Sequence, residues 1–73
     1  MERKFDCYCV EVSDDGSEFE LIFEMNGNVV DKEVCYCIDD VLGSVHGMYK
    51  RNCKKYGFDS RFDKLDINIS YKF

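Results

Sequence analysis

The chain has 73 residues, of which 45% are hydrophobic and 34% charged, with a formal net charge of −5 and five cysteines. A chain of this length makes one domain, expected over residues 1–73, and its aromatic content and regular periodicities exclude intrinsic disorder. No apolar run reaches the roughly 20 residues of a membrane span, no signal peptide is read, and an odd number of cysteines favours a reducing compartment, so a cytoplasmic protein is expected.

The N-terminal half predicts three strands. In residues 5–12, alternate residues of the first part share an apolar face, but Val10 and Val12 fall on the opposite face, as a β-bulge would allow. Residues 18–25 alternate regularly, which is typical of a half-buried strand. The dipeptide Asn26-Gly27 favours a type I′ turn, and the residues that follow it form the return strand.

A helix is expected over residues 39–56, where apolar residues recur at helical spacing. Asp39 or Asp40 can cap its N-terminus, and both carboxylates suit the positive end of the helix dipole. Gly57 suits the position that follows the last helical turn.

Residues 65–73 alternate strictly between apolar and polar side chains and predict the last strand. The expected fold is therefore α+β, a small antiparallel sheet of order β-β-β-α-β with one helix packed on one face. If residues 31–37 instead extend the helix backwards, the order is β-β-α-β. The apolar residues expected to form the core are Phe19, Leu21, Phe23, Val41, Leu42, Val45, Ile67 and Ile69.

The charge is divided unevenly along the chain. Residues 1–49 hold three Lys or Arg against twelve Asp or Glu, a balance of −9, whereas residues 50–73 hold seven against three, a balance of +4. Such a division governs association and steering rather than fold. The sequence therefore predicts a small domain that meets charged partners.

Carboxylates on the predicted hairpin form the first candidate site. Glu18, Glu20 and Glu24 project from one strand face, about 6–7 Å apart for every two residues, and Asp6 and Glu33 join them from neighbouring strands. Because DNA phosphates recur on a similar scale, such a stripe can occupy a groove lined with Lys and Arg. The alternative is a solvated face that keeps the protein soluble.

Two glycines, Gly43 and Gly47, form the second candidate site. Both fall on the helix face opposite the apolar stripe, and each costs about 1 kcal/mol relative to Ala in a helix interior. Together they leave a bare notch in which the backbone of a partner can approach closely. The alternative is drift on a tolerant surface, or a break in the helix.

The tripeptide Cys-Tyr-Cys occurs twice, with thiols at Cys7, Cys9, Cys35 and Cys37. Four thiolates can hold a structural zinc ion. However, two cysteines two apart on a strand place their sulfurs about 6.6 Å apart, which is too far for one ion unless the strand bends. We therefore expect small core residues, with no metal and no obligatory disulfide.

Catalysis has little support in this sequence. His46 is the only histidine, Ser44 does not face it on a helix, and Cys53 lies about 10 Å further along the helix axis. None of the common phosphate-binding, zinc-protease or nucleophile-elbow motifs is present. We expect no enzymatic activity and no cofactor.

A basic cluster near the C-terminus is the opposite kind of candidate. Such a cluster, with two tyrosines nearby, can bind nucleic acid, although the low overall pI argues against it and the helix dipole already explains the positive charge. Its members are Lys50, Arg51, Lys54, Lys55, Arg61 and Lys64, with Tyr49 and Tyr56 beside them.

Together these observations favour a small acidic, non-enzymatic protein-binding module. By analogy of size and charge, we expect a phage or mobile-element inhibitor, such as an anti-CRISPR protein, that acts as a nucleic-acid mimic and blocks the basic surface of a host nucleic-acid enzyme. Direct binding of nucleic acid or membrane is not expected. The alternative is a structural or regulatory subunit, either a homo-oligomer or a module that binds zinc through cysteines.

Overall fold

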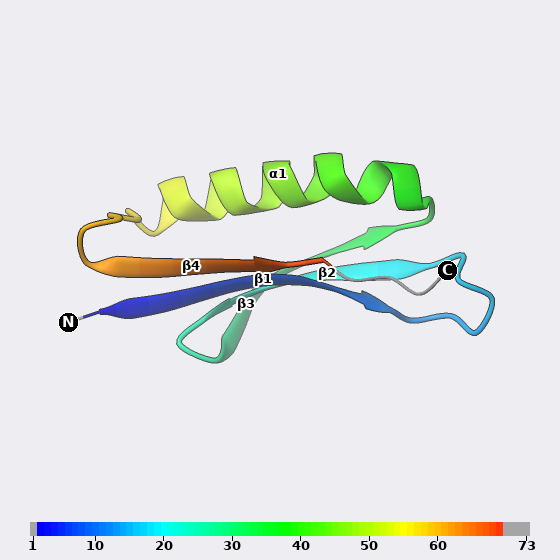
Figure 1. The fold of residues 1–73 in the computed structure, drawn as a ribbon, viewed down its shortest axis with the longest axis horizontal. Coiled ribbons are helices and arrows are strands. Elements are labelled where there is room, and N and C mark those ends of the chain that lie inside the picture. Colours follow the sequence, from blue (N-terminus) through cyan, green and yellow to red (C-terminus); the bar gives the residue numbers. More distant parts are fainter. Residues whose placement is uncertain (1, 70–73) are drawn as a thin grey trace.

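The computed structural model describes residues 2–69 and contains four strands and one helix in the order β-β-β-α-β. The helix packs on one face of the sheet, so the expected α+β fold is confirmed (Figure 1). The alternative order β-β-α-β is wrong, because residues 31–35 belong to a strand. The elements are β1 (Arg3–Glu11), β2 (Phe19–Met25), β3 (Asn28–Cys35), α1 (Ile38–Lys55) and β4 (Asp63–Asn68).

The sheet is mixed, with strand order β3-β2-β1-β4. β2 is antiparallel to both β1 and β3, but β4 pairs with β1 in parallel. The expectation of an entirely antiparallel sheet is therefore wrong for this one pair. The physical reason is the helix: α1 carries the chain back along the sheet, so β4 starts from the same end as β3 and runs in the same direction.

The hairpin between β2 and β3 has the expected turn. Asn26 has φ 53° and Gly27 has φ 83°, and positive φ at both positions is what a type I′ turn requires. The bulge lies in β3 instead of β1: Phe23 pairs with Asp31 but Glu24 pairs with Val29, which leaves one extra residue in β3. β1 pairs regularly with β2 from Phe5 to Glu11.

The helix begins one residue earlier than expected. Its N-cap is Cys37, an extended residue whose side chain makes no capping hydrogen bond, while Asp39 and Asp40 lie in the first turn. The prediction that an aspartate caps the helix is therefore wrong, although both carboxylates still favour the positive end of the helix dipole. At the other end Gly57 has φ 64°, as expected of the residue that terminates a helix.

The core lies between α1 and the sheet and contains five of the eight residues predicted for it. Leu42 and Ile67 were predicted wrongly, because they are 62% and 42% exposed, and Ile69 is only partly buried. The reason is that α1 packs against β1, β2 and β3 and not against β4, so Ile67 near the end of β4 stays exposed. The buried hydrophobic residues are Phe5, Cys7, Cys9, Phe19, Leu21, Phe23, Cys35, Val41, Val45 and Met48.

A buried carboxylate ties the start of the chain to its last strand. Asp63 accepts hydrogen bonds from Arg3 Nε and Nη2, at 3.1 and 2.8 Å, and from the backbone N–H of Asp59. Arg3 also donates to the carbonyl oxygens of Tyr56 and Gly57. This network fixes the connection from α1 to β4, and with it the parallel pairing of β4 with β1.

Within residues 2–69, no helix is long and apolar enough to cross a membrane. Tyr71 and Phe73, which the sequence places in the last strand, lie outside the described residues.

Candidate functional site

The side of the sheet away from α1, here called the open face, has no layer of structure packed on it within residues 2–69 (Figure 1). Tyr8 and Ile22 lie opposite each other near its centre, and the next pair on this face is Val10 and Glu20. The open face therefore combines apolar and aromatic side chains with charged ones.

Three carboxylates lie side by side across three strands of the open face. Asp6 pairs directly with Glu24 of β2 on one side and with Asp66 of β4 on the other. Strand spacing places neighbouring members of this acidic row about 4.8 Å apart at the backbone. No ion pair among the described residues includes any of the three. Like charges directly opposite each other destabilise a sheet, so this row opposes folding.

Two more of the predicted carboxylates lie near this row. Glu20 is on the open face, where its carboxylate lies 3.5 Å from Lys32 Nζ. Glu18 directly precedes β2, and its carbonyl oxygen accepts a hydrogen bond from Val12. The structure thus gathers four of the five predicted acidic residues on or beside one face.

The fifth, Glu33, lies on the other side of the sheet. It pairs with the buried Leu21, so it points toward α1, where its Oε2 is 4.0 Å from Arg51 Nη1. Arg51 also binds Asp31 at 2.8 Å. The expectation that Glu33 joins the acidic face is wrong, because the β3 bulge and register assign it to the helix side.

The negative field of the open face acts on Tyr8. A hydrogen bond to the Glu24 carboxylate raises the pKa of the Tyr8 phenol, and partial burial and the charges of Glu24, Asp6 and Glu20 raise it further. Tyr8 therefore stays protonated and remains a hydrogen-bond donor within the acidic surface.

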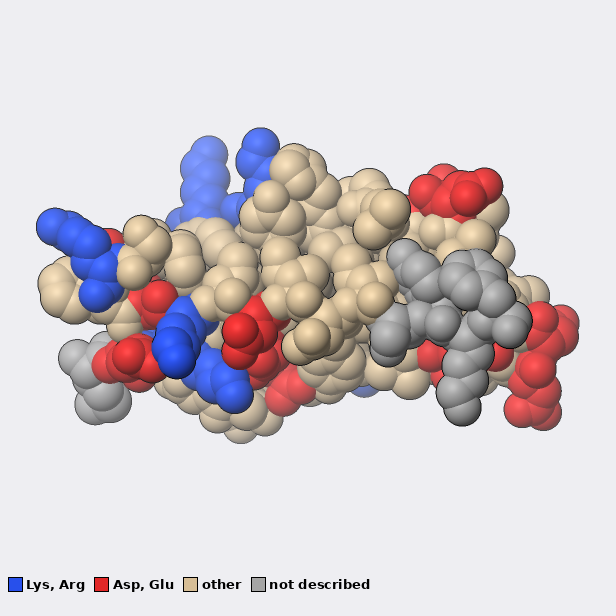
Figure 2. Space-filling view, in the orientation of Figure 1, with Lys and Arg blue, Asp and Glu red and all other residues tan. Residues whose placement is uncertain are grey.

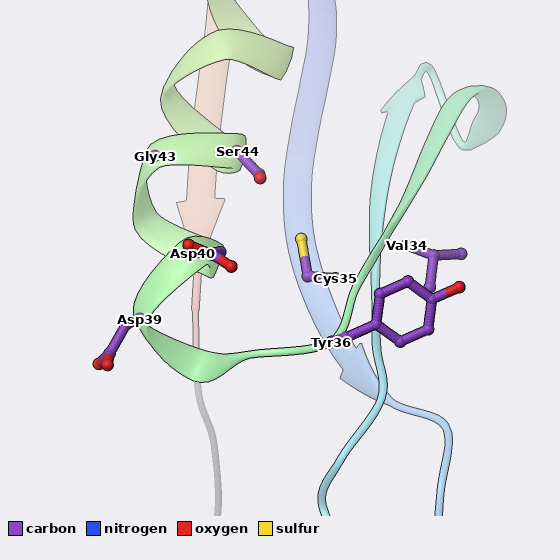
Figure 3. Close-up of a pocket in the computed structure, with 7 residues that line it drawn as sticks. All are labelled: Val34, Cys35, Tyr36, Asp39, Asp40, Gly43 and Ser44. Carbon is purple, nitrogen blue, oxygen red and sulfur yellow. The ribbon is translucent and has the colours of Figure 1, made fainter.

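The two glycines lie on the exposed side of α1. A Cβ atom added at Gly43 or Gly47 would meet no atom within 4 Å, so the notch expected from the sequence is open space. A hollow of about 460 Å³ lies beside Gly43 at the start of the helix, and Asp40 and Ser44 point into it (Figure 3). Its lining residues are Val34, Cys35, Tyr36, Asp39, Asp40, Gly43 and Ser44.

The cysteines of the two Cys-Tyr-Cys tripeptides do not share one environment. Cys7, Cys9 and Cys35 are core residues, whereas Cys37 is exposed at the helix N-cap. Burial raises the pKa of the Cys7 thiol to about 11, so it is a neutral packing group at ordinary pH. Among residues 2–69, no group of three or more His, Cys, Asp or Glu side chains could hold a metal ion.

The residues considered for catalysis are not assembled into a catalytic group. The only hydrogen bond recorded for the His46 side chain within residues 2–69 joins its Nδ1 to the hydroxyl of Tyr49, at 3.1 Å. Ser44 lines the hollow at the helix start, and burial raises the pKa of the Cys53 thiol. No described hydrogen bond links His46 to Ser44 or Cys53.

Basic side chains gather at the C-terminal end of α1, and acidic ones lie at its N-terminal end. Figure 2 shows blue side chains over the C-terminal part of α1 and red ones over its N-terminal end, separated by a broad uncharged band. Arg51 and Arg61 already bind carboxylates of this chain, Asp31 and Asp59. The basic cluster is therefore partly neutralised from within, which makes it a weaker candidate for a phosphate surface.

Sequence reasoning missed Asp66 as a member of the acidic row. Its place on the polar face of the last strand follows from alternation, but its position beside Asp6 depends on the parallel pairing of β4 with β1, which no local pattern encodes.

Comparisons of this chain with protein-family models, with curated proteins and with solved structures find no match.

Proposed function

We propose that this protein is a small, non-enzymatic, cytoplasmic binding module that uses its open face to occupy a basic surface of a protein partner. The observation that carries the proposal is the acidic row formed by Asp66, Asp6 and Glu24. Like charges placed side by side oppose folding, and a cationic partner would relieve that repulsion when it binds.

Two further features support a protein as the partner. Tyr8 and Ile22 lie next to the acidic row and offer an aromatic and an aliphatic contact, whereas a phosphate backbone would be repelled by the row itself. Tyr side chains contribute strongly at protein interfaces, because they bury a large area and keep a polar hydroxyl.

The partner class that we propose is a protein that handles nucleic acid. Surfaces that bind phosphates present arrays of Lys and Arg, and carboxylates at strand spacing can pair with such an array. The biological setting that we propose, an inhibitor carried by a phage or another mobile element and acting on host defence, as anti-CRISPR proteins do, rests on analogy of size and charge.

The proposal is tested by capture from a nuclease-treated host lysate. The open-face variant Asp6→Asn/Glu20→Gln/Glu24→Gln is compared with the wild-type chain and with a matched control, Glu2→Gln/Glu11→Gln/Asp14→Asn, which removes the same charge from exposed positions elsewhere. We expect wild type and control to retain one partner that the open-face variant loses. Equal retention by all three chains would contradict the proposal.

A further inference from the structure

The two outer strands of the sheet differ in how well they are protected from pairing with another strand. β3 carries the bulge near Val29, and Lys32 stands on its open-face side; both are devices that discourage edge pairing. β4 pairs with β1 through six consecutive residue pairs without a bulge. The outer edge of β4 is therefore the regular, extended edge of this sheet.

The side chains beside this edge are incompletely covered. Because α1 lies over β1, β2 and β3, Ile67 of β4 and Leu42 of α1 stay exposed on the helix side. Figure 2 shows a band of uncharged side chains between α1 and β4, with acidic and basic side chains close together where β4 begins. The β4 edge thus joins an uncovered apolar surface to a charged one.

The open-face charges of β4 are repeated by those of β1. Lys64 pairs directly with Lys4, and Asp66 pairs directly with Asp6, two residues further along both strands. Each pair places like charges opposite each other, which is unfavourable within a single chain. Across these two strands the face therefore consists of a positive row beside a negative row.

We propose that the β4 edge pairs antiparallel with the β4 edge of a second copy of this chain, with Leu65 opposite Leu65 of the partner subunit. In this register Lys64 lies opposite Asp66 of the partner subunit, and Asp66 lies opposite Lys64 of the partner subunit. Each negative row then continues into a positive row of the other copy. The interface is isologous and its charges are self-complementary.

The same register suits the helix side of the sheet. Opposite residues in an antiparallel pair point to the same face, so both helices lie on one side of a continuous eight-stranded sheet. Ile67 comes to lie opposite Asp63 of the partner subunit. The Asp63 carboxylate already accepts hydrogen bonds from Arg3 and Asp59, so an apolar neighbour leaves none of those bonds unmade.

The test combines the mass in solution with reversal of the two charges. Wild type should reach twice the 8.6 kDa mass of one chain as concentration rises. Lys64→Glu and Asp66→Lys should each weaken the dimer by roughly tenfold, because each reverses two cross-strand attractions. Each change also removes a pair of like charges inside the chain, so neither variant should be less stable as a monomer. Loss of the dimer can therefore not be attributed to unfolding.

Complementation identifies the register. The double variant Lys64→Glu/Asp66→Lys should regain the dimer, and an equimolar mixture of the two single variants should form a heterodimer, visible by native mass spectrometry when one chain carries a tag. Lys50→Glu, on the exposed side of α1, is the control and should keep the wild-type mass. A wild-type chain that stays monomeric throughout, or single variants that keep the dimer, would overturn the proposal.

Discussion

The contrast between Leu21 and Leu42 shows how little residue type alone says about burial in this chain. Leu21 is fully buried between α1 and the sheet, whereas Leu42 is 62% exposed although it lies one residue from the buried Val41. The buried residues of the helix are Val41, Val45, Met48 and Asn52, and Leu42 lies outside this stripe.

Leu21→Ala should destabilise the fold by about 2–5 kcal/mol, because truncation of a buried leucine loses transfer free energy and leaves a cavity. Leu42→Ala should change the free energy of unfolding by no more than about 0.5 kcal/mol, as is usual for exposed positions. Urea unfolding of the two variants and the wild type measures both values. An equal loss of stability in the two variants would contradict this packing of α1 on the sheet.

Asp63 gives the chain a specific sensitivity to acid. Its hydrogen bonds with Arg3 lower its pKa from 3.8 to about 2, so the folded state favours the carboxylate. The resulting stability is present above pH 3.8 and is lost as the pH falls toward 2. The difference in Tm between wild type and Asp63→Asn should therefore narrow over that range. A difference that stays constant with pH would contradict this role.

At the scale of elements, the sequence predicted the features that depend on neighbouring residues. It did not predict the contacts between elements that are distant in the chain. The Asn26-Gly27 turn, the end of the helix at Gly57 and the alternation of β2 each depend on neighbouring residues, and the sequence predicted all three. The parallel pairing of β4, the exposure of Ile67 and the position of Glu33 depend on where α1 lies and on one extra residue in β3. No local pattern determines those features.

For the candidate site too, the sequence predicted the part that lies on one strand but not the part that depends on pairing between strands. Alternation along β2 placed Glu20 and Glu24 together on one face, as observed. The acidic row to which Glu24 belongs is completed by Asp66, which reaches Asp6 only because β4 pairs with β1. For a site spread over several strands, the sequence therefore predicts which residues of each strand share a face, but not which strands lie next to each other.

The helix contains two glycines that its fold does not require. Gly43 and Gly47 face open space, so Gly43→Ala and Gly47→Ala should each stabilise the protein by about 1 kcal/mol. Gly57 is the matched control: with φ 64° it should lose stability when replaced by Ala. Thermal unfolding of the three variants checks the ranking. If Gly43 and Gly47 serve partner binding, their Gly→Leu variants should fold well and bind poorly.

At the scale of the whole molecule, the sign of the charge differs between the two ends of α1, and negative charge is concentrated on the open face. The ends of α1 differ in sign (Figure 2). The open face carries the acidic row together with Glu20. A partner recognised through such a surface is attracted over a distance comparable to the Debye length, about 8–10 Å at physiological salt.

Binding of the partner should therefore be sensitive to salt. Raising the salt concentration should slow association much more than it speeds dissociation, because exposed charges act mainly on the encounter. Association and dissociation rates measured across a salt series check this expectation. An association rate that is independent of salt would exclude electrostatic recognition by the open face.

The measurement that tests the central claim most directly is the affinity of the captured partner for three purified chains. Wild type and the control Glu2→Gln/Glu11→Gln/Asp14→Asn should bind with similar Kd values. The open-face variant Asp6→Asn/Glu20→Gln/Glu24→Gln should bind at least roughly tenfold more weakly while remaining equally folded. If the open-face variant and the control lose affinity equally, net charge alone governs binding and the open face is not the binding surface.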